Sequence, residues 1–123
     1  RYLDGISEKK RRLLEYTWPS PVTFLVPDNG HVPSWIKGDH DKVALRVSKH
    51  PTVSTICHAL GGPIVSTSAN PTGQSPALTA RQVRQYFGNE IDLLVPGNLT
   101  GLEGPSEIRD LDTGEIIRSR SVR

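Results

Sequence analysis

Cysteine is nearly absent from this sequence, which has a single one, Cys57, among 123 residues. A lone cysteine excludes an internal disulfide framework and a zinc site built from cysteines alone. Aromatic residues are also few (two Trp, three Tyr and two Phe). No apolar run approaches the ~20 residues that a membrane-spanning helix needs, and residues 1–12 are mostly polar and charged, so we expect neither a span nor a signal peptide. These absences favour a soluble, intracellular protein.

What the sequence does have is the composition of one ordinary domain, expected over residues 1–123, with 35% hydrophobic and 23% charged residues. Its net charge of +2 is unevenly distributed, because residues 1–12 hold five basic and two acidic side chains and residues 115–123 hold three Arg and one Glu. Basic ends can contact nucleic acid or phosphate, but on charge alone they are more typical of a solvated helix face and a solvated tail.

Hydrophobic periodicity and turn residues predict strands that alternate with helices. We expect helices at 7–16, 51–60 and 80–87, a short turn at 34–37, strands at 22–26, 43–47, 63–65 and 91–95, and a hairpin of 107–111 with 115–118. Ser7, Thr79 and Gly61 are suited to cap these helices. The order predicts an α/β fold in which helices pack on a sheet with parallel or mixed pairing.

The apolar residues of segment 51–60 follow the spacing of one helix face, formed by Val53, Ile56, Cys57 and Leu60. We expect this face to be buried and Cys57 to be a small core residue rather than a reactive thiol.

Segment 66–70, with the sequence Ser-Thr-Ser-Ala-Asn, follows the predicted strand 63–65. Ligands of open α/β sheets bind at the carboxyl ends of strands, where hydroxyl, amide and backbone N–H groups suit phosphate and carboxylate oxygens. Ser and Asn also cap ordinary turns. Both interpretations remain open on this segment alone.

Arg46 lies inside the predicted strand 43–47. A charge buried in a strand must be paired or reach a cavity, so Arg46 either binds an acid in segment 39–41 or faces a ligand. Arg109 and Arg118 add cations near Ser106. Several arginines with clustered hydroxyls and no assigned acid or base favour the binding of anionic groups, as in phosphoryl or nucleotidyl transfer. We assign no metal site, because segment 39–41 is more typical of a solvated loop.

Five linked blocks of sequence carry a resemblance to a known family. They are WPSPVTF at 18–24, ALRV at 44–47 with His50-Pro51, GGPIVSTSAN at 61–70 with Gly73, PSEIRD at 105–110, and GEIIR at 114–118. In this order they resemble the YrdC-like family of threonylcarbamoyl-AMP synthases, most closely its bacterial single-domain branch.

The resemblance implies a YrdC-like twisted mixed sheet with flanking helices around a basic concave cavity. It implies synthesis of L-threonylcarbamoyl-adenylate and pyrophosphate from ATP, L-threonine and bicarbonate, with Mg²⁺ accompanying ATP. Further implied partners are tRNA and the threonylcarbamoyl-transferase proteins that modify it, in the cytoplasm and with no membrane.

The resemblance also assigns residues. Its Ser-x-Asn element matches Ser68 and Asn70, which with Arg118 would bind ATP. Arg46, Ser66 and Ser106 would bind threonine or the carbamate, and the cavity would be lined by Thr23, Thr67 and Arg109.

One part of the family pattern is missing, namely the N-terminal portion with its Lys-x-Arg pair. We therefore expect the chain to correspond to the C-terminal two-thirds of the domain, with low stability or self-association. Residues 9–12 contain Lys-x-Arg twice, but in a setting that predicts an exposed helix face. Alternative functions are a non-catalytic RNA- or nucleotide-binding remnant, and the carbamoyl-adenylate domain of hydrogenase maturation proteins.

Overall fold

The computed structural model describes residues 1–97 and 106–119, and these fall into two compact units. Unit 1 contains residues 1–64 and 106–119, and unit 2 contains residues 65–97. The expectation of a single domain over the whole chain stays a prediction.

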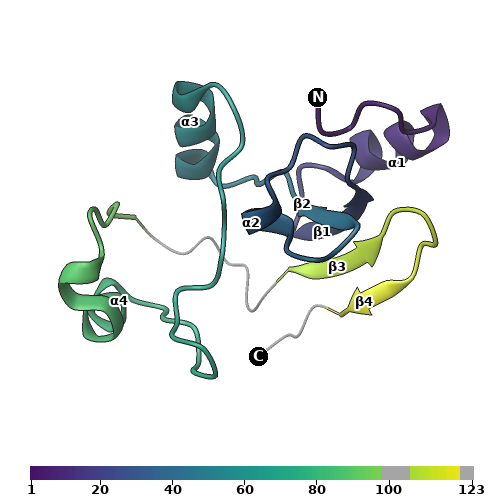
Figure 1. Ribbon diagram of the computed structural model, residues 1–123. Helices are drawn as coiled ribbons and strands as arrows, with labels where there is room; N and C mark the ends of the chain where they lie inside the picture. Colours follow the sequence, from purple (N-terminus) through teal and green to yellow (C-terminus); the bar gives the residue numbers. More distant parts are fainter. Residues whose placement is uncertain (98–105, 120–123) are drawn as a thin grey trace. The chain divides into compact units, whose positions relative to one another are not determined.

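Unit 1 is built on a four-stranded mixed sheet (Figure 1). The strands lie in the order β2-β1-β3-β4, where β1 is Val22–Pro27, β2 is Lys42–Leu45, β3 is Glu107–Asp110 and β4 is Ile116–Arg118. β1 pairs antiparallel with β2 and parallel with β3, and β3 forms an antiparallel hairpin with β4. This confirms the predicted mixed α/β architecture, the strand at 22–26 and the hairpin.

The core of unit 1 lies between the sheet and helix α1 (Glu8–Thr17). Alternate residues of β1 point to one face of the sheet, where Phe24 and Val26 are fully buried and pack with Leu14 of α1. Burying a side chain of this size contributes about 1.5–3 kcal/mol. Ser7 caps α1 as predicted, because its Oγ accepts the N–H of Lys10 at 3.3 Å.

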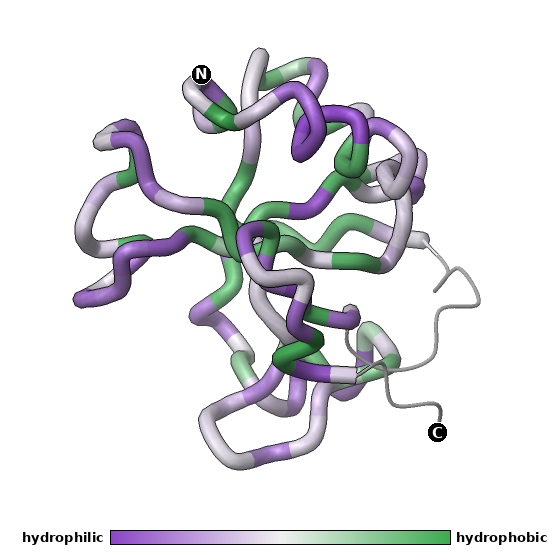
Figure 2. The backbone as a smooth tube through the Cα atoms, turned by 90° about the vertical axis from the view of Figure 1, so that its right-hand side faces the viewer, coloured by the Kyte–Doolittle hydropathy of each residue, from purple (hydrophilic) through white to green (hydrophobic). Residues whose placement is uncertain are grey.

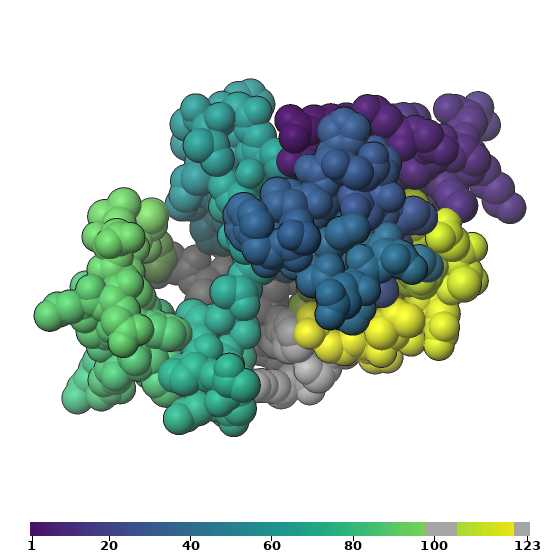
Figure 3. All heavy atoms as spheres, viewed as in Figure 1, coloured from purple at the N-terminus to yellow at the C-terminus, as the bar shows by residue number. Residues whose placement is uncertain are grey.

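Two further helices belong to unit 1, α2 (Ser34–Lys37) and α3 (Pro51–Leu60). Figure 3 shows α2 and the loop around it, in blue, on the molecular surface. α3 begins after His50, whose Nδ1 accepts the N–H of Thr52, and ends at Gly61 in the left-handed conformation that glycine favours. These ends match the prediction.

The prediction that one face of α3 is buried is wrong. No residue of α3 is buried, and Ile56 and Leu60 are 38% and 67% exposed. Cys57 is half-buried rather than a core residue. The core cluster on the described sheet takes its helical cover from Leu14 of α1 and includes no residue of α3, so the apolar residues of α3 have no core to pack against there.

Unit 2 contains helix α4 (Ala80–Phe87), which continues into the 3₁₀ helix η1 (Gly88–Glu90). Thr79 caps α4 as predicted, with its Oγ1 accepting the N–H of Gln82 at 3.1 Å. The predicted strands at 63–65 and 91–95 are wrong, because neither segment pairs with another strand among the described residues. Without a partner, a β-rich segment lacks the ladder hydrogen bonds that define a strand.

Hydrophobic residues occur in short stretches along the chain, separated by hydrophilic ones (Figure 2). Across the described residues, no helix combines the length and the apolar character that crossing a membrane requires.

Candidate functional site

Three of the residues predicted for the site meet in unit 1. The hydroxyl of Thr23 forms a hydrogen bond with the hydroxyl of Ser106, with 2.8 Å between the oxygens. The guanidinium of Arg118 donates twice to the backbone carbonyl of Ser106, from Nε at 3.1 Å and from Nη2 at 2.8 Å. Two hydroxyls and one guanidinium therefore form a connected group, called the Thr23 cluster below.

Strand pairing explains why residues so distant in sequence come together. The parallel register of β1 and β3 sets Thr23 opposite Ile108, two residues after Ser106. A register shift in the β3–β4 hairpin sets Arg118 opposite Ile108 as well. Since alternate residues of a strand share a face, Thr23, Ser106 and Arg118 all lie on one face of the sheet.

Burial differs across the cluster in a way that suits ligand binding. Thr23 is 9% exposed, Ser106 is half-buried and Arg118 is exposed. The buried hydroxyl is held by Ser106, while the guanidinium keeps donors free to reach a solvent-borne anion. Arginine presents its donors in a planar fork that matches carboxylate and phosphate oxygens.

Arg109 lies on the opposite face of β3 from the Thr23 cluster, because it is opposite Phe24 in the register with β1. Its Nη2 pairs with Glu107 Oε2 at 2.9 Å, and its Nε is buried with no hydrogen-bond partner among the described residues. The structure therefore does not bring Arg109 to Ser106 and Arg118.

The expectation of a buried charge at Arg46 is wrong. β2 ends at Leu45, and Arg46 lies beyond the strand with an exposed side chain. Within the described residues it has no ion pair to segment 39–41 or elsewhere. Because β2 is an edge strand that ends before Arg46, this guanidinium lies in solvent, which hydrates its charge.

The Ser-Thr-Ser-Ala-Asn segment belongs to unit 2 and has no regular secondary structure. Ser66, Thr67 and Ser68 are exposed, so their hydroxyls are accessible to a ligand. Asn70 donates from Nδ2 to the carbonyl of Pro71 at 3.0 Å, while its Oδ1 is buried without a partner in the described chain. An unsatisfied buried acceptor costs about 1–3 kcal/mol, and a ligand donor would remove that cost.

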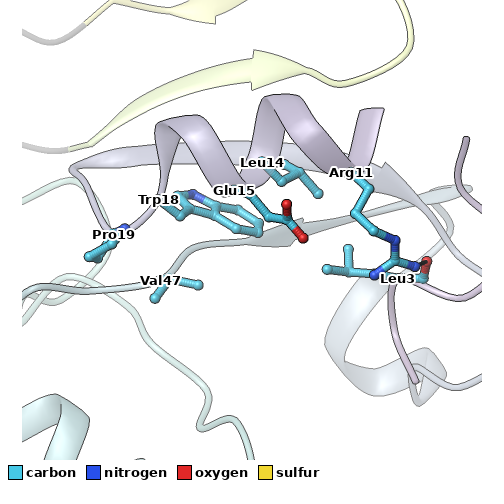
Figure 4. Close-up of a pocket in the computed structure, with 7 residues that line it drawn as sticks. All are labelled: Leu3, Arg11, Leu14, Glu15, Trp18, Pro19 and Val47. Carbon is cyan, nitrogen blue, oxygen red and sulfur yellow. Dashed lines mark hydrogen bonds between the residues drawn. The ribbon is translucent and has the colours of Figure 1, made fainter. Parts of the chain in front are cut away.

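A hollow of about 260 Å³ lies elsewhere in unit 1, beside α1 (Figure 4). It is lined by Leu3, Arg11, Leu14, Glu15, Trp18, Pro19 and Val47. Its lining is mainly apolar, with one basic and one acidic side chain, and it contains no residue of the Thr23 cluster. It therefore differs from the basic cavity that the resemblance implies, which stays a prediction.

Asp110 is a residue of this region to which sequence reasoning gave no role. Its carboxylate accepts the N–H groups of Asp112 at 2.8 Å and Thr113 at 3.0 Å, and it pairs with Lys42 Nζ at 2.5 Å. The bond from Lys42, opposed by burial and aided by the two N–H groups, lowers the pKa of Asp110. An aspartate four residues before a turn glycine, Gly114, was the available signal.

Similarity to known proteins shows the family to which this chain belongs. The family model Sua5/YciO/YrdC, described as "Telomere recombination", matches residues 1–120. The chain belongs to this family. Threonylcarbamoyl-AMP synthase of Cellvibrio japonicus is 48% identical over 117 residues, which are 95% of this chain and 62% of that protein. The synthase of Stutzerimonas stutzeri is 51% identical over 116 residues, which are 94% of this chain and 62% of that protein.

This Sua5/YciO/YrdC chain thus spans about three-fifths of the length of the curated relatives it matches. Among solved structures, P. abyssi Sua5 in complex with L-threonine has a TM-score of 0.80 and 29% identity, over 90% of this chain and 33% of that one. A doubly substituted variant of the same protein has a TM-score of 0.81 and 30% identity, over 88% of this chain and 33% of that one. These likenesses confirm the family fold.

Proposed function

We propose that this chain provides a nucleotide- and threonine-binding part of an L-threonylcarbamoyladenylate synthase, a nucleotidyltransferase of tRNA modification. In this reaction the amino group of threonine and bicarbonate form a carbamate with loss of water. A carbamate oxygen then attacks the α-phosphorus of ATP and displaces pyrophosphate. Support comes from the relatives named threonylcarbamoyl-AMP synthase and from the Sua5 structure that contains L-threonine.

The observation that carries this proposal is the Thr23 cluster. The hydroxyl oxygens of Thr23 and Ser106 are 2.8 Å apart. The Arg118 guanidinium donates two of its five N–H groups to the Ser106 carbonyl, and the others can bind a ligand. The reaction joins a carboxylate-like oxygen to a phosphate, so positioning and charge stabilisation are its main requirements. A guanidinium beside paired hydroxyls meets both requirements without an acid–base residue.

Individual roles follow the family pattern. Arg118, Ser68 and Asn70 would bind ATP, and Ser106, Ser66 and Arg46 would bind threonine or the carbamate. Thr23 would orient the Ser106 hydroxyl, to which it is bonded. Thr67 and Arg109 would contribute to the surroundings of the ligands.

Mg²⁺ would enter with ATP rather than through protein carboxylates. Within the described residues, no group of three His, Cys, Asp or Glu side chains gathers to hold a metal ion. The guanidinium of the Thr23 cluster suits phosphate oxygens, and those oxygens would themselves hold Mg²⁺. Bicarbonate as co-substrate, tRNA with its threonylcarbamoyl-transferase proteins as later partners, and a cytoplasmic location complete the proposal.

Calorimetric titration of ATP into the full chain tests this proposal. We expect Arg118→Ala to weaken ATP binding roughly ten- to a hundredfold, since a charge-assisted hydrogen bond contributes about 1.5–3 kcal/mol and 1.4 kcal/mol is tenfold. Threonine-dependent pyrophosphate release, with bicarbonate and Mg²⁺, should fall with the same variant.

Arg12→Ala is the matched control, because it removes the same charge from an exposed arginine of α1, whose ion pair within the described residues is with Glu8 at 3.3 Å. We expect this variant to bind ATP within twofold of the wild type. Equal ATP affinity of the wild type and Arg118→Ala, with both folded, would contradict the proposal.

A further inference from the structure

Asp110 connects three parts of unit 1 through one carboxylate. Its Oδ1 accepts the backbone N–H groups of Asp112 and Thr113, in the turn between β3 and β4. Its Oδ2 accepts Nζ of Lys42, on the far side of β1 from β3. Asp110 itself is 7% exposed, whereas the side chain of Lys42 is 31% exposed, so the carboxylate is buried and its lysine partner reaches solvent. The carboxylate therefore closes the hairpin turn and ties it across the sheet.

The neighbouring charges extend this connection to α1. Lys42 also lies 3.4 Å from Asp112 Oδ2, and Asp112 Oδ1 pairs with Lys10 Nζ at 2.5 Å. Lys10, Lys42, Asp110 and Asp112 thus form one alternating network of two cations and two anions. Pairing lowers the pKa of both aspartates and raises the pKa of Lys42.

The outer strand of the hairpin, β4, is held by its pairing with β3 and by the turn between them. Among the strands that the structure describes, β4 is an edge strand next to β3, and all three of its residues are exposed. Two backbone hydrogen bonds lie at this turn. The N–H of Asp110 donates to the carbonyl of Glu115 at 2.8 Å, and the N–H of Gly114 donates to the carbonyl of Asp110 at 2.9 Å. The position of β4, and with it that of the Arg118 guanidinium, is therefore set by this pairing together with the turn that Asp110 organises.

We propose that Asp110 is a positioning residue for the Thr23 cluster: by closing the turn and binding Lys42, it holds Arg118 over Ser106. The effect of Asp110 on ligand binding rests on the proposed function, whereas its effect on the position of Arg118 does not. Asp110 touches no ligand in this proposal and acts only through Arg118. Neutralising its carboxylate should release the guanidinium from the Ser106 carbonyl while the core around Phe24 remains packed.

The test is Asp110→Asn in the full chain, followed by two readouts. The ¹H–¹⁵N signal of Arg118 Nε reports its bond to the Ser106 carbonyl, and calorimetry reports ATP affinity. We expect the Nε signal to shift towards that of a solvent-exposed arginine and ATP affinity to fall roughly tenfold, the loss of about 1.4 kcal/mol.

Asp28→Asn is a matched control within the same unit. The Oδ1 of Asp28 accepts the N–H groups of Gly30 and Val32, and its Oδ2 accepts Lys37 Nζ at 2.6 Å, with a side chain that is 7% exposed. The chemistry is the same, but it organises the loop after β1 rather than the hairpin. We expect Asp28→Asn to leave both the Arg118 signal and ATP affinity unchanged.

Lys42→Gln keeps the turn bonds of Asp110 and removes the tie across the sheet, and it should move the Arg118 signal less than Asp110→Asn does. An unchanged Arg118 signal in folded Asp110→Asn, or in Lys42→Gln should the first variant not fold, overturns the positioning role. If the Arg118 signal shifts in Asp110→Asn and the wild-type chain binds no ATP, the positioning role is supported and the proposed function is contradicted.

Discussion

The two compact units differ most in how many of their side chains are buried. Every residue that is buried in the described chain belongs to unit 1, including Phe24 and Val26, which are almost completely enclosed. None of the residues 65–97 of unit 2 is buried. Unit 2 depends on local bonds, such as those from Ala77 N to Ala69 O and from Tyr86 Oη to Ser75 O. The sheet of unit 1 therefore carries most of the hydrophobic stabilisation.

This difference also separates the residues that are predicted to bind ligands. The Thr23 cluster lies on the stabilised sheet, whereas Ser66, Ser68 and Asn70 lie in the unit without a core. Sites on paired strands are held more accurately than sites on loops, and loops open at lower free energy. We therefore expect the Thr23 cluster to be held more accurately than Ser68 and Asn70.

The largest effect expected from this comparison comes from Phe24→Ala. Removing a fully buried phenylalanine costs about 3–5 kcal/mol, a large part of the stability of a small domain. Amide NMR spectra should lose the dispersed signals of unit 1, with little change in those of residues 65–97. Tyr16→Ala is the control, because Tyr16 is 92% exposed and its loss should cost no more than about 0.5 kcal/mol. Simultaneous collapse of both sets of signals would show that the two units fold as one.

Acid should destabilise unit 1 through three paired carboxylates. The pKa values of Asp28, Asp110 and Asp112 are lowered from 3.8, first by the bonds from Lys37, Lys42 and Lys10 respectively. Their contribution to stability is therefore complete above the unfolded value and is lost as the pH falls through the lower folded values.

Thermal unfolding of unit 1, followed by circular dichroism between pH 6 and 2, measures this loss. We expect the midpoint to fall most steeply below pH 3.8, and less steeply in the Asp110→Asn variant, which has no carboxylate to protonate at that position. A midpoint that is independent of pH below 3.8 would argue against the ion-pair network.

The smallest effect should come from Thr79→Ala in unit 2. Loss of the bond that Thr79 Oγ1 accepts from Gln82 N costs a helix about 1 kcal/mol. Carbon chemical shifts should report partial loss of α4 and no change in unit 1. Thr72→Ala, at an exposed turn of the same unit, is the control and should leave α4 intact. Equal effects of the two variants would mean that α4 does not depend on its cap.

Local features were predicted well because the interactions that decide them span a few residues. Ser7 and Thr79 begin helices by accepting an N–H three residues ahead, and Gly61 ends one by adopting a positive φ. The hairpin is likewise decided by its own turn residues. Strands at 63–65 and 91–95 were predicted from β propensity, which indicates that a segment can pair but not whether a partner is beside it.

The sequence by itself therefore determined the helix ends, the central strand, the hairpin and the family to which the chain belongs. Only the tertiary structure decided which residues meet, because pairing of β1 with β3 joins Thr23 to Ser106 across 83 positions and Lys42 to Asp110 across 68. Tertiary structure also decided that Arg46 lies in solvent, since β2 ends one residue earlier. Contacts over such separations depend on strand register and on the packing of α1 against the sheet, which no local pattern encodes.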